Sequence, residues 1–168
     1  MNYHNITYPD LNNGIGLRVT LWLSGCDNKC KGCHNPQTWD KNSGTKFNDT
    51  TKKKLFDVLA KEYIEGITFS GGDPLHENNI KEVNELIDEI RTKYPQKTIW
   101  LFTGNTLENI YKEESIRKEI IEKCDVLVDG RFIEEQKDLS LAWRGSRNQR
   151  VIDIPKTLKS GKIELYTE

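Results

Sequence analysis

The chain has 168 residues, a length typical of one compact domain. Its 25 basic and 26 acidic side chains nearly cancel, which argues against non-specific nucleic-acid binding by the domain. No apolar run approaches the roughly 18 residues of a membrane span, and residues 1–10 lack the apolar core of a signal peptide. We therefore expect a cytoplasmic protein with reduced thiols and with neither nucleic acid nor a membrane as its partner.

Predicted strands and helices alternate along the chain. Residues 17–23 are rich in β-branched and aromatic side chains, as in a buried strand, and a cysteine-rich loop follows at 24–39. A helix is expected over 51–64, with Gly66 at its end. Apolar side chains at helical spacing predict two more helices at 77–94 and 107–123. For the second, a helix broken near Ser115 is the alternative to a continuous one. Short strands are expected at 67–69, 98–102, 126–128 and 149–154.

This alternation predicts an α/β fold with a mainly parallel sheet, because parallel strands need crossover connections. Four or five strands are too few for a closed eight-unit barrel, which typically takes about 250 residues. We expect an open, partial (β/α) barrel over residues 1–155, followed by a weakly patterned C-terminal tail at 156–168. Residues that follow the strands should meet at the carboxyl edge of the sheet. They are Cys26, Gly71-Gly72-Asp73, Thr103-Gly104 and Asp129-Gly130.

Three of the four cysteines, Cys26, Cys30 and Cys33, fall within eight residues of one another. Such crowding suits a metal or a cluster better than a disulfide framework. A zinc site would need four tetrahedral ligands, but the adjacent Cys33 and His34 can hardly both reach one ion, and no second cysteine pair follows. A c-type haem would explain the C-x-x-C-H run that ends at His34, but it leaves Cys26 without a role, and no export signal is present.

The cysteine pattern favours a third interpretation, a cubane iron–sulfur cluster. Three thiolates would leave one iron without a protein ligand, and a catalytic metal centre needs such an open position. A ferredoxin-like electron carrier would instead need a closed set of four ligands, for which Cys124 is the only candidate. Cys124 directly precedes the predicted strand at 126–128 and is expected to be a semi-buried structural thiol.

The C-x3-C-x2-C spacing after the first strand resembles that of the radical S-adenosylmethionine enzymes. Further blocks over about residues 1–152 are similar to the anaerobic ribonucleotide reductase activating proteins, which are small glycyl-radical activases. The most specific are Ser70-Gly71-Gly72-Asp73-Pro74-Leu75, Asp129-Gly130-Arg131-Phe132, and Trp143-Arg144-Gly145-Ser146 with Asn148-Gln149. The chain departs from the family at Asn105, where an aromatic residue is common, and after Pro155, beyond the usual end.

The resemblance implies a radical-SAM type of partial barrel with a [4Fe–4S] cluster on Cys26, Cys30 and Cys33. It also implies that S-adenosylmethionine chelates the open iron and is cleaved to a 5′-deoxyadenosyl radical. The implied cofactor contacts are Gly32, Cys33, His34, Gly71, Gly72 and Asp73. The radical would take a hydrogen atom from a glycine of the anaerobic ribonucleoside-triphosphate reductase, with an electron donor such as reduced flavodoxin.

A final expectation concerns the partner. The segment 143–150 carries Arg144, Arg147 and Arg150 beside Trp143 and contains no acidic residue. Arginine and tryptophan are typical anchors of protein interfaces, so Arg144 and Arg147 are predicted to help dock the reductase. The alternatives are a solvated loop, or one arginine that pairs with the cofactor carboxylate.

Overall fold

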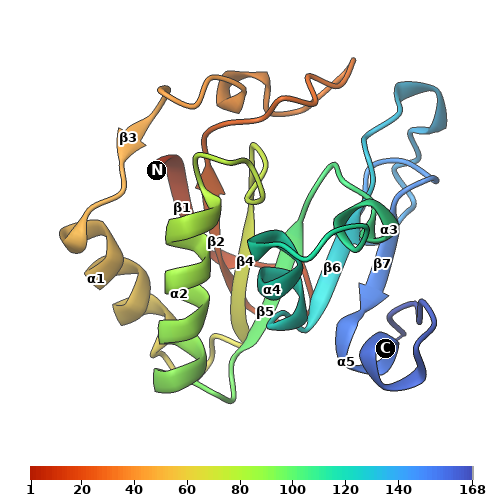
Figure 1. Cartoon of the computed structure of the whole chain (residues 1–168). Helices are drawn as coiled ribbons and strands as arrows, with labels where there is room; N and C mark the ends of the chain where they lie inside the picture. Colours follow the sequence, from red (N-terminus) through yellow and green to blue (C-terminus); the bar gives the residue numbers. More distant parts are fainter. Residues whose placement is uncertain (168) are drawn as a thin grey trace.

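The computed structural model describes residues 1–167, which form one open sheet with helices packed on it (Figure 1). The sheet has seven strands in the order β3-β1-β2-β4-β5-β6-β7. Their bounds are β1 Asn2–Asp10, β2 Arg18–Leu23, β3 Thr45–Lys46, β4 Gly66–Gly71, β5 Thr98–Phe102, β6 Val126–Asp129 and β7 Arg150–Asp153. The helices are α1 Asp49–Leu59, α2 Ile80–Lys93, α3 Leu107–Ile110, α4 Ile116–Glu122 and α5 Ile154–Ser160.

The four central strands β2, β4, β5 and β6 run parallel, while β1 and β3 at one edge and β7 at the other are antiparallel. The sheet does not close, so the expected open α/β architecture with a parallel centre is confirmed. The radical-SAM type of barrel stays a prediction. No helix within residues 1–167 is long and apolar enough to cross a bilayer.

One face of the sheet packs against helices, and the other face lines a pocket. Leu21, Phe69, Leu101 and Leu127 lie side by side on the four parallel strands, and all four are fully buried in the main core under α1, α2 and α4 (Figure 1). Successive side chains of a strand point to opposite faces. The next residue on each strand therefore faces the other side, where Trp22, Ser70, Phe102 and Val128 line a pocket.

Several expected elements differ from the structure. The predicted count of four or five strands is wrong, because the polar segment Asn2–Asp10 forms β1 and pairs with both β2 and β3. The first helix ends at Leu59 rather than at residue 64, and Gly66 begins β4 instead of ending that helix. The break considered near Ser115 is confirmed, since the helix expected over 107–123 is divided into α3 and α4, and Ser115 caps α4 by accepting a hydrogen bond from the Lys118 amide.

Residues 156–166 also belong to the fold. The chain continues through α5, and residues 163–166 return along the outer edge of β7. Asp153 N donates to Glu164 O at 2.9 Å, and Tyr166 N donates to Val151 O at 2.8 Å. The tail thus extends the antiparallel edge of the sheet, and the domain boundary at residue 155 stays a prediction.

Candidate functional site

A pocket of about 470 Å³ lies at the carboxyl ends of the parallel strands. The residues expected at this edge come together there, since its walls include Cys26, Gly71, Gly72, Asp73, Thr103, Gly104 and Gly130. Asp129 is the exception among them, because its side chain is 1% exposed and pairs with Arg150 behind the pocket wall. The sequence thus located the pocket correctly from the ends of the strands alone.

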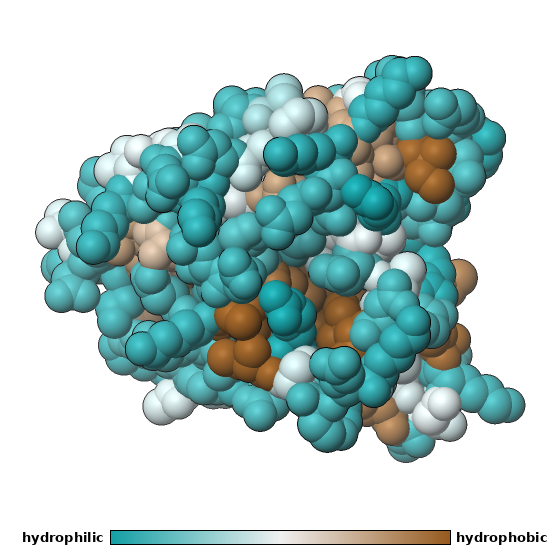
Figure 2. All heavy atoms as spheres, turned by 45° about the horizontal axis from the view of Figure 1, so that its top comes forward, coloured by the Kyte–Doolittle hydropathy of each residue, from teal (hydrophilic) through white to brown (hydrophobic). Residues whose placement is uncertain are grey.

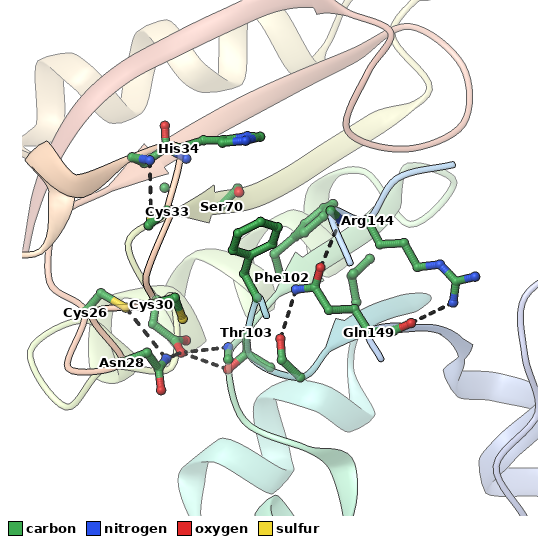
Figure 3. Close-up of a pocket in the computed structure, with 18 of the residues that line it drawn as sticks. Cys26, Asn28, Cys30, Cys33, His34, Ser70, Phe102, Thr103, Arg144 and Gln149 are labelled. Carbon is green, nitrogen blue, oxygen red and sulfur yellow. Dashed lines mark hydrogen bonds between the residues drawn. The ribbon is translucent and has the colours of Figure 1, made fainter. Parts of the chain in front are cut away.

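Cys26, Cys30 and Cys33 are all free, half-buried and part of the pocket wall (Figure 3). The loop enters the site along a fixed path, because Gly25 N donates to Thr38 O at 2.7 Å and Cys26 N to Trp39 O at 3.1 Å. Cys33 N donates to Cys30 O at 3.1 Å and closes a turn between these two cysteines. Gly32, with a φ of 76°, supplies the left-handed conformation that this turn needs.

Hydrogen-bond donors surround two of the sulfur atoms. Asn28 Nδ2 lies 3.6 Å from Cys26 Sγ, and Asn35 N donates to Cys33 Sγ at 3.3 Å. Burial raises the pKa of the Cys26 thiol, while backbone and side-chain donors of Asn28 and the backbone of Lys29 oppose that rise. These donors would stabilise the negative charge of a metal-bound thiolate.

Within residues 1–167, no three histidine, cysteine or acidic side chains are arranged as ligands of a single metal ion. A cubane cluster makes a different demand, because each of its cysteine ligands binds a separate iron and the sulfurs need not meet at one point. Three free thiols on one pocket wall are soft donors of the kind such a cluster takes. The residues present therefore fit a cluster.

Cys124 lies away from this pocket. Its side chain is 2% exposed in the core between the sheet and the helices, and its Sγ donates to Ile120 O at 3.3 Å. Burial raises the pKa of the Cys124 thiol to about 12. The expectation of a structural thiol is confirmed, and Cys124 is not placed as a fourth cluster ligand.

Asp73 links three parts of the site. Its Oδ2 accepts hydrogen bonds from Asn28 Nδ2 at 3.2 Å, Thr103 Oγ1 at 3.0 Å and Gly104 N at 3.1 Å. Its Oδ1 accepts from Leu75 N at 2.9 Å. The side chain is 4% exposed, and burial raises its pKa against these donors. Both oxygens are engaged by the protein, so a contact of Asp73 with a cofactor stays a prediction.

The glycines expected to contact the cofactor mainly allow backbones to approach each other. A Cβ on Gly72 would lie 2.5 Å from Gly25 O, and one on Gly71, whose φ is 101°, would lie 2.5 Å from Leu23 N. Both glycines thus pack the end of β4 against the entry to the cysteine loop. Gly32 is exposed and does not line the pocket, and a Cβ there would lie 3.0 Å from Glu134.

His34 does line the pocket, together with Phe132, whose ring centroid lies 5.8 Å from that of His34. The two ring planes are tilted by 45° to each other, and both rings lie in the pocket wall to which the cysteines also belong. Sequence reasoning missed Phe132, Asn28 and Gln149 as site residues. The position of Asn28 inside the cysteine motif was the one signal that pointed to it.

The side chains of the segment 143–150 lie in different surroundings, and the docking role of its arginines stays a prediction. Trp143 is half-buried, lines the pocket and packs with its ring centroid 5.1 Å from that of Trp100. Arg150 pairs with Asp129 and Glu108. Arg144 lines the pocket and donates to Gln149 O at 2.6 Å (Figure 3), whereas Arg147 is exposed.

The fold and the site define an α/β protein with three free cysteines, which fit an iron–sulfur cluster, in a loop at the carboxyl edge of its parallel strands. Residues 12–152 match the family model described as a 4Fe-4S single cluster domain. Three curated relatives, all named anaerobic ribonucleoside-triphosphate reductase-activating protein, come from Vibrio cholerae, Escherichia coli K12 and Enterobacteria phage T4. They are 42%, 41% and 41% identical to this chain over 151, 153 and 152 residues.

These alignments cover 89%, 90% and 90% of this chain and 96%, 97% and 93% of the respective relatives. The chain belongs to the family of anaerobic ribonucleoside-triphosphate reductase-activating proteins. The resemblance noted in the sequence is thereby confirmed.

Proposed function

We propose that this chain activates an anaerobic ribonucleoside-triphosphate reductase by cleaving S-adenosylmethionine reductively at a [4Fe–4S] cluster. The observation that carries the proposal is the meeting of three free cysteines, spaced C-x3-C-x2-C, with the ends of β4, β5 and β6 in one pocket. When bound, the cluster and S-adenosylmethionine supply one-electron chemistry that yields a 5′-deoxyadenosyl radical, which takes hydrogen from a glycine of the reductase.

In this proposal Cys26, Cys30 and Cys33 hold the cluster, and the absence of a fourth cysteine beside them leaves one iron for the cofactor. The Asn28 amide and the Asn35 N–H donate to two of the sulfurs and lower the cost of keeping them charged. Asp73 holds Asn28 and the end of β5 in place, so the cysteine loop keeps its position relative to the sheet.

The rest of the pocket has the size and lining for the cofactor. Its volume of about 470 Å³ lies in the range of small-molecule sites. We assign the rings of His34 and Phe132 to the adenine, because both line the pocket and aromatic rings pack favourably against one another. Arg144 also lines this pocket, and we assign its positive charge, held by the hydrogen bond to Gln149 O, to the carboxylate of the cofactor.

The names of the relatives support an anaerobic ribonucleoside-triphosphate reductase as the partner, because each relative is named as an activating protein of that reductase. The face of the molecule in Figure 2 is largely hydrophilic with small apolar patches, so polar and charged side chains are the means of recognition that it offers. We retain the exposed Arg147 as a docking residue for the reductase and place Arg144 with the cofactor. A soluble donor such as reduced flavodoxin would supply the electron.

The test is anaerobic reconstitution with iron and sulfide, followed by addition of a strong reductant and S-adenosylmethionine. The proposal predicts release of 5′-deoxyadenosine and, when the reductase is present, a glycyl radical signal in electron paramagnetic resonance. Arg147→Ala should still release 5′-deoxyadenosine without the reductase but give less glycyl radical with it. A reconstituted wild-type protein that binds iron and releases no 5′-deoxyadenosine would overturn the proposed reaction.

A further inference from the structure

The C-terminal segment contributes an aromatic ring to the face of the sheet that holds the pocket. Residues 163–166 run antiparallel to β7, with a bridge between Leu165 and Ile152. This places Tyr166 against Trp100, which lies on β5 and is 1% exposed. The segment lies outside residues 12–152, which match the family model.

Tyr166, Trp100 and Trp143 form a three-ring cluster. The ring centroids are 5.1 Å apart for Trp100 and Trp143, 5.3 Å for Trp100 and Tyr166, and 6.0 Å for Trp143 and Tyr166. The corresponding interplanar angles are 74°, 67° and 75°, so every pair meets edge to face. This is a favourable arrangement of aromatic rings, and each ring is held by the other two.

Trp143 needs such support because its backbone is strained. Its φ is 59°, a left-handed conformation that bulky residues rarely adopt and that the surrounding packing must maintain. Trp143 also lines the pocket, as does the next residue, Arg144. The conformation of Trp143 therefore sets the direction in which the chain continues to Arg144 at the pocket wall.

Gln149 holds the other end of this wall. Its Oε1 accepts from Gly145 N at 2.9 Å and from Ser146 N at 3.1 Å, and its backbone oxygen accepts from Arg144 Nη1. Gln149 Nε2 in turn donates to Gly130 O at 3.0 Å, just after β6. Among these contacts, hydrogen bonds hold the pocket wall formed by residues 143–149 at Gln149. At Trp143, only ring packing holds it.

We propose that Tyr166 is a positioning residue for the cofactor pocket. It acts through Trp143: its ring holds the tryptophan in the left-handed conformation and thereby keeps Arg144 at the pocket wall. Tyr166 does not itself line the pocket. The inference rests on the proposed function, because the ligand whose affinity Tyr166 would affect is S-adenosylmethionine.

The test compares Tyr166→Ala, Tyr166→Phe and Leu165→Ala in the anaerobically reconstituted full chain. Leu165 is a matched control because it is the neighbouring residue of the same segment and its side chain is 55% exposed. S-adenosylmethionine affinity is measured by calorimetric titration, and iron per chain is measured on the same samples. Acrylamide quenching of tryptophan fluorescence in the metal-free chains provides a readout that does not depend on the iron–sulfur cluster.

Tyr166→Ala should weaken S-adenosylmethionine binding about tenfold, because two aromatic contacts of the three-ring cluster are lost. The iron content should stay at the wild-type level. Quenching should increase as Trp143 becomes accessible. Tyr166→Phe and Leu165→Ala should match the wild type in all three measurements.

Two results would overturn the positioning role. One is wild-type affinity in Tyr166→Ala despite increased quenching, since the wall would then not depend on the ring cluster. The other is loss of iron in Tyr166→Ala, since the tail would then support the cysteine loop or the whole fold. A wild-type protein that fails to bind S-adenosylmethionine would refute the proposed function itself, and the comparison of variants separates the two failures.

Discussion

The side-chain amide of Asn28 donates a hydrogen bond to the carboxylate of Asp73 at 3.2 Å and joins the cysteine loop to the end of β4. The same amide nitrogen lies 3.6 Å from Cys26 Sγ (Figure 3). A buried carboxylate and a cysteine thus share one donor, and the geometry of the cysteine loop depends on Asp73.

Asp73→Asn should destabilise the protein and loosen the cysteine loop. The variant amide keeps only one acceptor oxygen, and its NH2 group faces either Leu75 N or the donors of Asn28 and Gly104, so at least one buried donor loses its partner. We expect a loss of about 2–3 kcal/mol in the free energy of unfolding and lower iron per chain after reconstitution. Urea unfolding and iron analysis measure both.

The matched control is Asp27→Asn, the same change in a loop side chain that is 90% exposed and pairs with His76. It should cost less than about 1 kcal/mol, because a carboxylate that is 90% exposed remains solvated in the folded chain. Equal effects of the two substitutions would show that Asp73 has no special role in the loop.

The cysteines should divide into two groups. Cys26→Ser, Cys30→Ser and Cys33→Ser should each lose most of the iron chromophore, because each removes a ligand from the same pocket wall. Cys124→Ser should keep full iron, since this thiol lies in the core under the helices. Anaerobic absorption spectra and iron analysis distinguish the groups, and loss of iron from Cys124→Ser would favour a closed, ferredoxin-like cluster.

A side chain at Gly72 should damage the cysteine loop before it affects cofactor binding. If Gly72 only contacted the cofactor, as the sequence resemblance implies, a side chain there would fill the cofactor space and leave the cluster in place. The structure instead places the new Cβ 2.5 Å from Gly25 O, so the backbone must shift. Gly72→Ala should therefore lower both iron content and the free energy of unfolding, the latter by about 1–3 kcal/mol.

Gly161→Ala is the appropriate comparison for Gly72→Ala. Gly161 ends α5 with a φ of 72°, and a Cβ there meets nothing within 4 Å. It should cost about 1 kcal/mol through backbone strain and leave the iron content unchanged. Full iron content in Gly72→Ala would show that the cysteine loop tolerates the displacement.

The ion pair of Glu108 with Arg150 should make stability depend on acid pH. The Arg150 guanidinium lowers the pKa of Glu108 from its usual 4.5 to about 2. Because the folded-state pKa is the lower one, the stabilisation is present above about pH 4.5 and is lost as the pH falls toward 2. Glu108 is largely exposed, so solvent screening keeps the effect small.

Glu108→Gln should therefore be less stable than the wild type by at most about 1 kcal/mol at neutral pH, and the difference should vanish toward pH 2. Urea unfolding at a series of pH values follows the difference. A difference in the free energy of unfolding between the wild type and Glu108→Gln that grows as the pH falls would contradict the stabilising role of this ion pair.

The sequence predicted the parallel centre of the sheet and the pocket edge because those features follow from local patterns. The strand at 98–102 was located at both ends, since its apolar run is bounded by Pro95 and by Thr103-Gly104. The cysteine spacing indicated a cluster without any knowledge of the fold.

The features that were missed depend on contacts between distant residues. β1 is an edge region with mostly half-buried side chains, so its polar sequence carries no clear alternation. Ile64 looked like the last residue of a helix because it is apolar, but it enters the core from a loop, fully buried. The role of Tyr166 could not be predicted because its partner Trp100 is far away in sequence.

The central claim is that three cysteines hold a [4Fe–4S] cluster whose remaining iron binds S-adenosylmethionine. Mössbauer spectroscopy of protein reconstituted with isotopically enriched iron tests it most directly, with spectra recorded before and after S-adenosylmethionine is added anaerobically. We predict that one of the four irons changes its isomer shift and quadrupole splitting on addition, while the three cysteine-bound irons do not. Four equivalent irons that are unaffected by S-adenosylmethionine would contradict it.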